Sequence, residues 1–227
     1  VTKPRSILKL TFCSCSSGIG RLFALRIGRA GARVALVARR EAELRALARE
    51  IEAAGGDAVA LPADLAGRDE ALHCAERAVA ALGGIDVLVS NAGYGRHRRF
   101  LDWELDDMER VMRVNYFAAL ALTKALLPAM VERGRGWLVY VSSVAGRIAP
   151  PDESAYAASK FALSGLAASL SLEVEEAGVH VLTVHPSVKA TSVQELVALL
   201  KANPGQYSFA SSGASSQPRL VGEMFKL

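Results

Sequence analysis

The sequence predicts an α/β protein with a doubly wound parallel sheet in a three-layer α/β/α arrangement. Strand-like and helix-like segments alternate along the chain, and this order builds a parallel sheet with helices on both faces. The predicted strands are continuously apolar, as strands buried on both faces are. The chain has 227 residues, of which 51% are hydrophobic, so it is long enough to bury a sizeable core.

The predicted strands are short apolar runs, and the predicted helices lie between them. Strands are expected at residues 7–12, 33–38, 58–62, 87–90, 137–142 and 179–184. Helices are expected at residues 19–30, 41–54, 68–82, 105–133 and 155–177. Several of these helices end at a glycine, a residue that readily takes the left-handed conformation found at helix ends.

Composition and charge exclude several classes of protein. The formal net charge is +4, and the densest basic cluster, Arg96-His97-Arg98-Arg99, is expected to be a solvated loop rather than a nucleic-acid groove. We find no run of about 18 apolar residues, so no membrane span is predicted. The apolar stretch near residue 10 is expected to be the first strand rather than a signal sequence, because a turn and a helix follow it directly.

The three cysteines are Cys13, Cys15 and Cys74, an odd number without the spacing of metal ligands. Cys13 and Cys15 are too close together for an ordinary disulfide. Reduced thiols in a cytoplasmic protein are therefore expected, and no metal site.

A tyrosine and a lysine lie four residues apart in the last predicted helix. Tyr156 and Lys160 share one face of that helix because of this spacing. An ammonium group beside a phenol stabilises the phenolate, so such a pair can act as a general acid and base near neutral pH. The same spacing occurs in ordinary amphipathic helices, and it gains weight here from the rest of the chain.

The first strand-to-helix turn, residues 13–20, reads C-S-C-S-S-G-I-G. A glycine-rich turn at this point lets backbone N–H groups approach a pyrophosphate at a helix N-terminus. Arg39 and Arg40 follow the second strand, where a carboxylate would hold a ribose 2′-hydroxyl and arginines suit a 2′-phosphate. These features favour NADP(H) over NAD(H) as the cofactor.

In this order, the motifs resemble those of the short-chain dehydrogenase/reductase family over residues 8–186. The resemblance rests on an ordered set of residues rather than on one motif. The set is Ser16-Ser17-Gly18-Ile19-Gly20, Asp64-Leu65, Asn91-Ala92-Gly93, Asn115, Ser143, Tyr156 and Lys160. It implies a Rossmann dinucleotide-binding domain over residues 1–186.

The resemblance also implies roles for the residues of the reaction site. Ser143 would hydrogen-bond the substrate oxygen, and Tyr156 would exchange its proton. Lys160 would stabilise the tyrosine phenolate and hold the nicotinamide ribose, while Asn115 would hold a water of a proton relay. The family spacing selects Ser143 over its neighbour Ser142, which is expected to be a residue at the end of a strand.

The remaining matched residues are implied to hold the cofactor. Asp64 and Leu65 would contact the adenine, and residues 91–93 would form the floor of the cofactor cleft. Pro186 is the last of the implied cofactor-binding residues. Ser14 departs from the family pattern, which has glycine there, so its side chain must be accommodated near the phosphates.

The segment after residue 186 is a second departure. Residues 185–227 resemble part of the solute-binding proteins of tripartite tricarboxylate transporters, with S-V-Q-E-L-V-A-L-L-K-A-N-P-G and L-V-G-E-M-F-K as the matching features. We expect residues 187–227 to be an atypical extension with a helix at 193–202 and a flexible tail, not an independent domain.

The predicted function is interconversion of a carbonyl compound and a secondary alcohol with NADP(H). Two alternatives stay open from the sequence. Ser143, Tyr156 and Lys160 also suit a cofactor-independent esterase or other hydrolase, and the fold also suits a non-catalytic binding or scaffold protein.

A homodimer or homotetramer is expected, built through the helices predicted at 105–133 and 155–177. Both are apolar around more of their circumference than one sheet covers. Small residues such as Ala118, Ala119, Gly165 and Ala168 are expected to allow close packing across a two-fold axis.

Overall fold

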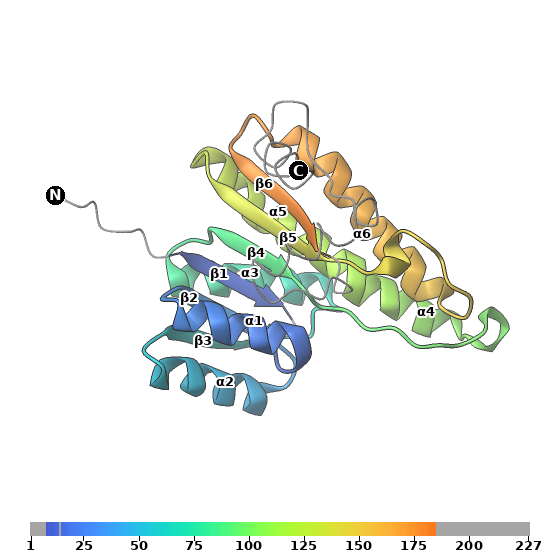
Figure 1. Ribbon diagram of the computed structural model, residues 1–227, viewed down its shortest axis with the longest axis horizontal. Helices are drawn as coiled ribbons and strands as arrows, with labels where there is room; N and C mark the ends of the chain where they lie inside the picture. The colour runs from blue at the N-terminus through green and yellow to red at the C-terminus, as the bar shows by residue number, and fades with distance from the viewer. Residues whose placement is uncertain (1–7, 14, 185–227) are drawn as a thin grey trace, which may run out of the picture.

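The structure, a computed structural model, describes residues 8–13 and 15–184 of the chain. Within these residues six parallel strands form one sheet in the order β3-β2-β1-β4-β5-β6 (Figure 1). The strands are β1 (Lys9–Cys13), β2 (Arg33–Ala38), β3 (Asp57–Pro62), β4 (Val87–Ser90), β5 (Gly136–Val141) and β6 (Val179–Val184). The strand order reverses between β1 and β4, so the predicted doubly wound parallel sheet is confirmed.

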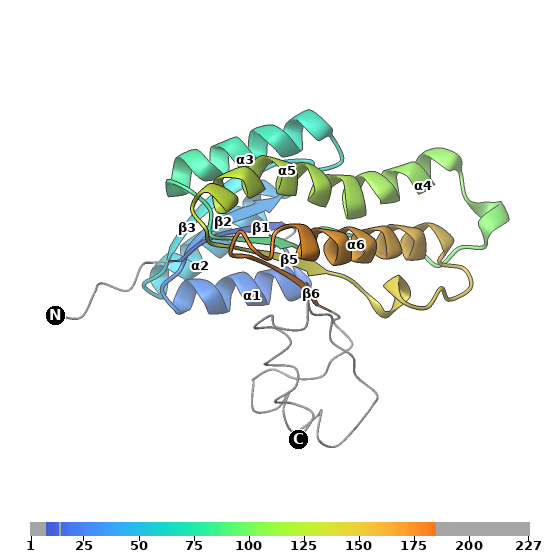
Figure 2. The same cartoon turned by 90° about the horizontal axis from the view of Figure 1, so that it is seen from above.

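Helices cover both faces of the sheet. On one face lie α1 (Gly18–Arg29) and α2 (Glu41–Ala53), and on the other lie α3 (Arg68–Leu82), α5 (Ala118–Glu132) and α6 (Ser154–Glu173), with α4 (Leu105–Met112) leading into α5 (Figure 2). Short 3-10 turns occur at η1 (Phe100–Asp102) and η3 (Val144–Gly146). Most predicted bounds lie within two residues of these, but α6 ends at Glu173, about one turn before the predicted end.

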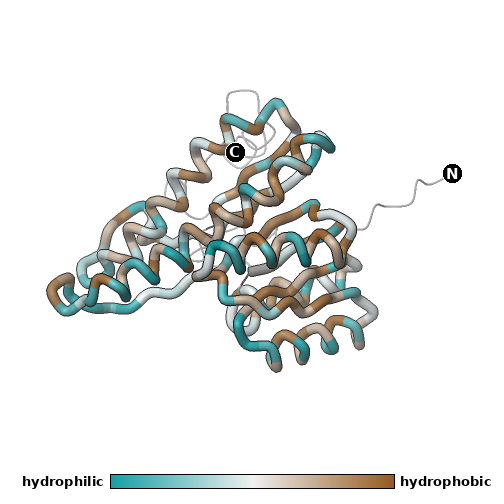
Figure 3. Tube along the Cα trace, turned by 180° about the vertical axis from the view of Figure 1, so that it is seen from behind, coloured by the Kyte–Doolittle hydropathy of each residue, from teal (hydrophilic) through white to brown (hydrophobic). Residues whose placement is uncertain are grey.

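The hydrophobic core has two parts, one on each face of the sheet. The larger cluster joins the strands to α3, α5 and α6 through residues such as Leu122, Leu138 and Leu163. The second joins them to α1 and α2 through residues such as Leu36 and Ile51. Figure 3 shows the hydrophobic residues concentrated along the central strands, while hydrophilic residues recur along the outer helices.

Burial along the strands is less uniform than predicted. In β2 five of six residues are buried, as expected for a central parallel strand. In β5 buried and half-buried residues alternate, and in β6 Leu182 and Val184 are 40% and 45% exposed. The expectation of continuous burial was wrong for these two strands, because α1 and α2 lie mainly against β1, β2 and β3.

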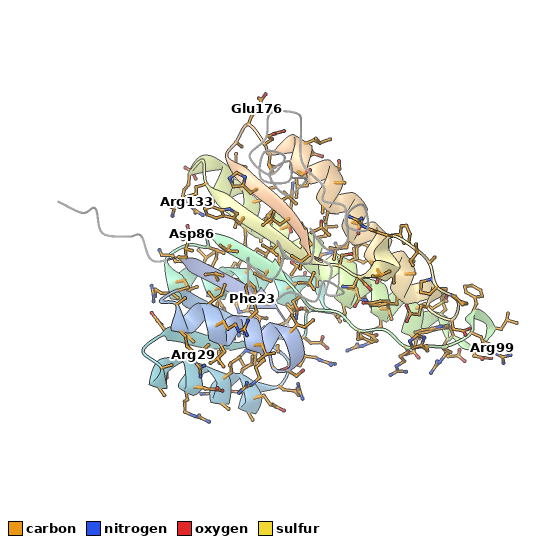
Figure 4. The ribbon with its side chains drawn as sticks, viewed as in Figure 1. Phe23, Arg29, Asp86, Arg99, Arg133 and Glu176 are labelled. Carbon is orange, nitrogen blue, oxygen red and sulfur yellow. The ribbon has the colours of Figure 1, made fainter. Side chains whose placement is uncertain are left out.

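Polar side chains tie together the amino ends of the central strands. The Asp86 carboxylate is nearly buried and accepts hydrogen bonds from Lys9 N at 3.1 Å and from Arg135 Nη2 at 3.0 Å. Arg133 Nη2 donates to the Ile85 carbonyl at 2.6 Å. In Figure 4, Asp86 and Arg133 lie at the end of the molecule opposite to Arg99, which belongs to the loop before α4. The amino edge of the sheet is therefore braced by structural contacts.

The predicted helix 105–133 is interrupted by a π-helical segment. Helix α4 passes into η2 (Arg113–Phe117), a π-helix, and then into α5. Its apolar pattern gives no sign of this interruption. The π-helix η2 contains Asn115, which is 1% exposed and hydrogen-bonded to the loop after β4 and to α6. Such π-helical segments often occur at functional sites.

The same helical stretch bears on two further expectations. Leu105–Glu132 is long and apolar enough to span a membrane by length and composition, with a mean hydropathy of 1.5 in its best window. Length and composition alone do not contradict the expectation that the chain has no membrane span. A core helix meets the same criterion, and Leu122, Leu126 and Met130 pack into the core.

Ala118 and Ala119 were expected to pack against a second copy of the chain across a two-fold axis. Both residues are instead buried in the core of the same chain, so this expectation was wrong for these two residues.

Candidate active site

The predicted site residues follow the carboxyl ends of the strands. The first turn follows β1, Arg39 and Arg40 follow β2, Asp64 follows β3, residues 91–93 follow β4 and Ser143 follows β5. Because the strands are parallel, these ends share one edge of the sheet, to which the arrowheads point in Figure 1. Ligands of doubly wound sheets bind at this edge, next to the point where the strand order reverses.

Tyr156 and Lys160 lie together on the first turns of α6. The Lys160 Nζ is 5.7 Å from the centroid of the half-buried Tyr156 ring. Lys160 is 4% exposed, and its Nζ donates a 2.9 Å hydrogen bond to the Val141 carbonyl at the end of β5. Burial lowers the pKa of Lys160 to about 8. A cation is thus held beside a phenol in a largely water-free position.

Asn115 connects the loop after β4 to α6. Its Oδ1 accepts a 2.9 Å hydrogen bond from Tyr94 N, and its Nδ2 donates at 2.9 Å to the Tyr94 carbonyl. The same Nδ2 donates at 2.9 Å to Ser159 Oγ, which in turn donates at 2.7 Å to the Tyr156 carbonyl. The Asn115 side chain therefore holds both the loop and the helix turn that carries Tyr156.

The two serines after β5 have different environments. Ser143 is half-buried, and its Oγ accepts a 3.2 Å hydrogen bond from Ala145 N at the start of η3. Ser142 is 2% exposed, and its Oγ lies 3.1 Å from Ser164 Oγ. Ser142 thus joins the strand end to α6, as expected of a structural residue, while Ser143 is the more accessible of the two.

The turn after β1 has the geometry of an anion-binding turn. Gly18 has a φ of 58°, and a Cβ added to it would meet no atom within 4 Å. Ser17 is the residue before α1, Ile19 is exposed and Gly20 is buried. Gly18 and Ile19, at the N-terminus of α1, are therefore exposed at this edge. The first N–H groups of a helix have no partner within the helix and can bind phosphates.

Arg40 lies against this turn. Its Nη2 and Nε donate to Ser16 Oγ at 3.0 and 3.3 Å, and its Nη1 is 3.5 Å from Glu43 Oε1. Cys15, in the same turn, is a buried thiol whose Sγ donates to the Val37 carbonyl at 3.6 Å. Burial raises the pKa of Cys15 to about 12, so the thiol stays protonated and unreactive.

Asp64 lies among basic side chains at the end of β3. Burial alone would raise its pKa, but hydrogen bonds from Ala66 N and Arg110 and the charges of Arg110 and Arg39 outweigh it and lower the pKa. Asp64 Oδ2 is 3.1 Å from Arg110 Nη2. Leu65, next in sequence, is buried in the core. The charge of Arg39 is therefore partly balanced by a carboxylate.

The loop after β4 approaches the lysine closely. Asn91 and Ala92 are half-buried. A Cβ added to Gly93 would lie 3.2 Å from Lys160 Nζ and 3.3 Å from Asn115 Oδ1. A larger residue at position 93 would crowd both groups, which explains glycine at this position.

Some residues fall outside the described part of the chain, and some contacts were not anticipated. Ser14, Pro186 and the expected boundary and extension after residue 186 lie outside the described residues. Tyr94 and Ser159 were missed, because their part in the Asn115 network depends on tertiary contacts without a sequence signal. No group of three or more His, Cys, Asp or Glu that could hold a metal ion occurs within 8–13 and 15–184.

Comparison with known proteins gives a consistent result. A family model of short chain dehydrogenases matches residues 12–199. A short chain dehydrogenase of Pseudocercospora fijiensis is 41% identical over 173 residues, which cover 75% of this chain and 56% of that protein. The dehydrogenase/reductase SDR family protein 7-like of Drosophila melanogaster is 37% identical over 194 residues, which cover 84% of this chain and 59% of that protein. The chain thus spans less than two thirds of the length of these relatives.

Solved structures agree in fold. A metagenomic short-chain oxidoreductase in complex with NADP has a TM-score of 0.78 and 37% identity, covering 91% of this chain and 96% of that chain. A short-chain dehydrogenase from Streptomyces avermitilis has a TM-score of 0.76 and 33% identity, covering 81% of this chain and 66% of that chain. Since the family match covers most of the sequence and the sheet has the corresponding architecture, the chain belongs to the short-chain dehydrogenase family.

Proposed function

We propose that the protein is an NADP(H)-dependent oxidoreductase that interconverts a carbonyl compound and a secondary alcohol, with Tyr156 as general acid and base. The observation that carries this proposal is the buried Lys160 ammonium beside the Tyr156 phenol. The pair lies at the ligand-binding edge of a doubly wound sheet, in a family whose cofactor is a nicotinamide nucleotide.

The residues of this edge fit such a nucleotide. The open turn at Gly18 and the N-terminus of α1 suit the pyrophosphate. Gly93 leaves room beside Lys160 Nζ, where the nicotinamide ribose would be held. The bound nicotinamide supplies or accepts the hydride.

The chain's own residues supply the proton and the orientation. During reduction Tyr156 donates its hydroxyl proton to the substrate oxygen as the C–H bond forms, and during oxidation the phenolate removes the proton of the alcohol. Ser143 Oγ donates a hydrogen bond to the same substrate oxygen. Lys160 stabilises the phenolate because its ammonium lies nearby in a buried position. The water-holding role of Asn115 stays a prediction, beside the structural contacts that its side chain makes.

Two arginines favour the phosphorylated nucleotide. Arg40 places its guanidinium against the phosphate-binding turn through Ser16, and guanidinium groups pair well with phosphates. Arg39 is adjacent, although Asp64 offsets part of its charge. The solved relative in complex with NADP supports the same preference by analogy.

The hydrolase alternative gains no support. The relatives named above are described as dehydrogenase, dehydrogenase/reductase or oxidoreductase. The non-catalytic alternative stays open, and it predicts no turnover of any substrate.

A homodimer is the assembly that the surface favours. A groove of about 510 Å³ lies between α4, η2 and the start of α6. Its lining includes Leu105, Met108, Met112, Phe117 and Ala158. Phe117 is 48% exposed, and Phe161 on the neighbouring α6 is 44% exposed. Exposed apolar side chains gathered on two adjacent helices suit the matching helices of a second copy across a two-fold axis.

Tyr156→Phe removes only the hydroxyl that exchanges the proton. Turnover should fall by about 10² to 10⁴, the usual contribution of general acid–base catalysis, while NADPH binding stays unchanged. Steady-state kinetics and fluorescence titration measure the two quantities. Near-normal turnover in this variant would refute the role of Tyr156.

Lys160→Met should raise stability at pH 7, because a pKa lowered from 10.5 to about 8 corresponds to about 3 kcal/mol of burial cost. Below pH 8 the lysine is charged in both the folded and unfolded chain, so this cost is present in full. Between pH 8 and 10.5 the folded protein loses the proton first, and wild-type stability rises. The advantage of the variant in thermal unfolding should therefore shrink over this range. If the difference in unfolding temperature between the variant and the wild type is the same at pH 7 and pH 10, the lowered pKa of Lys160 is contradicted.

Arg40→Ala should weaken NADPH binding by at least about tenfold, since a hydrogen bond to a charged group contributes roughly 1.5–3 kcal/mol. NADH binding should change little. Arg45→Ala is the matched control, because Arg45 lies on the same helix and pairs with Glu41. Fluorescence titration measures the affinities of the wild type and both variants for NADPH and NADH, and equal or tighter binding of NADH by the wild type argues against the preference.

Phe117→Glu places a charge in the groove and should convert a dimer to a monomer. Light scattering coupled to gel filtration measures the mass of both proteins. A wild-type mass of a single chain at micromolar concentration overturns the dimer.

A further inference from the structure

The loop after β4 is fixed to the start of α6 at its far end. Arg98 N donates a 2.7 Å hydrogen bond to the Asp152 carbonyl, and His97 Nε2 lies 3.0 Å from Glu153 Oε1. Asp152 has a φ of 62°, a conformation that is uncommon for residues other than glycine. These contacts hold the loop against the turn that precedes Tyr156.

The near end of the loop is fixed as well. Both polar groups of the Tyr94 backbone are hydrogen-bonded to Asn115, which also binds Ser159 on α6. Ser159 in turn donates to the Tyr156 carbonyl. The loop backbone and the Tyr156 backbone are therefore both attached to one buried side chain.

Gly95 lies between these two anchors, directly against the tyrosine. A Cβ added to Gly95 would lie 2.8 Å from Tyr156 Cγ and Cδ2, and 3.2 Å from its Cβ. Gly95 is not among the glycines with positive φ in the described chain, so its backbone conformation admits other residues. The contact with the tyrosine side chain, rather than the backbone angle, is what requires glycine here.

We propose that Gly95 is a positioning residue: its lack of a side chain lets the anchored loop support the Tyr156 ring in the orientation needed for proton transfer. This inference rests on the proposed role of Tyr156 as acid and base. A methyl group at position 95 must move either the loop or the ring. Hydrogen bonds hold the loop on both sides, whereas the ring turns about its own side-chain bonds, so the ring is displaced.

Displacement of the ring predicts a specific kinetic change for Gly95→Ala. A misplacement of about 1 Å lowers rates by about 10²-fold, so kcat should fall by at least tenfold, with the affinity for NADPH unchanged. The control is Gly67→Ala, since a Cβ added to Gly67 would come no closer than 3.6 Å to another residue.

A double-mutant cycle tests the contact without any activity measurement. Gly95→Ala should lower the thermal unfolding temperature of the protein with Tyr156, and it should have little effect once Tyr156→Ala has removed the ring. Equal destabilisation in both backgrounds overturns the contact.

The two proposals fail in different ways. If Tyr156→Phe is active, the proposed function is wrong. If Tyr156→Phe is inactive but Gly95→Ala has the kcat of the wild type, only the positioning role is wrong. Loss of NADPH affinity in parallel with kcat in Gly95→Ala also contradicts the positioning role, because it indicates a disturbed cleft rather than a displaced ring.

Discussion

Three hydrogen bonds of the buried Asn115 side chain join the loop after β4 to α6, and the geometry of the site depends on them. One side chain satisfies both polar groups of the Tyr94 backbone and holds Ser159, which binds the Tyr156 carbonyl. A buried amide that lost these partners would cost free energy, so the arrangement is strongly preferred once formed. The π-helical segment carries Asn115 to this position. Tyr156 is thereby fixed by a network that begins in another helix.

The same site contains a group that opposes folding. Lys160 is almost fully buried, and its ammonium donates a hydrogen bond to the Val141 carbonyl. Its burial cost of about 3 kcal/mol is a large share of a typical domain stability of about 5–15 kcal/mol. The two apolar clusters and the braced amino edge of the sheet supply the stability that keeps this charge in place. The fold is therefore stable enough to keep the buried Lys160 ammonium that the proposed chemistry requires.

The sequence predicted the sheet and the proximity of Tyr156 and Lys160, because both depend on local patterns. The alternation of strand-like and helix-like segments predicted a doubly wound parallel sheet, and the spacing of Tyr156 and Lys160 predicted their common helix face. The π-helical segment was missed because an apolar helix pattern continues through it. The contact of Gly95 with Tyr156 was missed because it joins distant segments, and glycine in a loop has many causes. The hydrogen bond from Arg40 to Ser16 was also missed, because it depends on the tertiary structure.

Hydride transfer coupled to proton exchange by Tyr156 is the proposed reaction of this site. Its most direct test is a panel of carbonyl compounds and chromogenic esters, each incubated with and without NADPH. We expect that NADPH is consumed with at least one carbonyl compound, that the product is the secondary alcohol, and that no ester is cleaved. Ester cleavage without NADPH that disappears in Ser143→Ala, or the absence of any turnover, would contradict it.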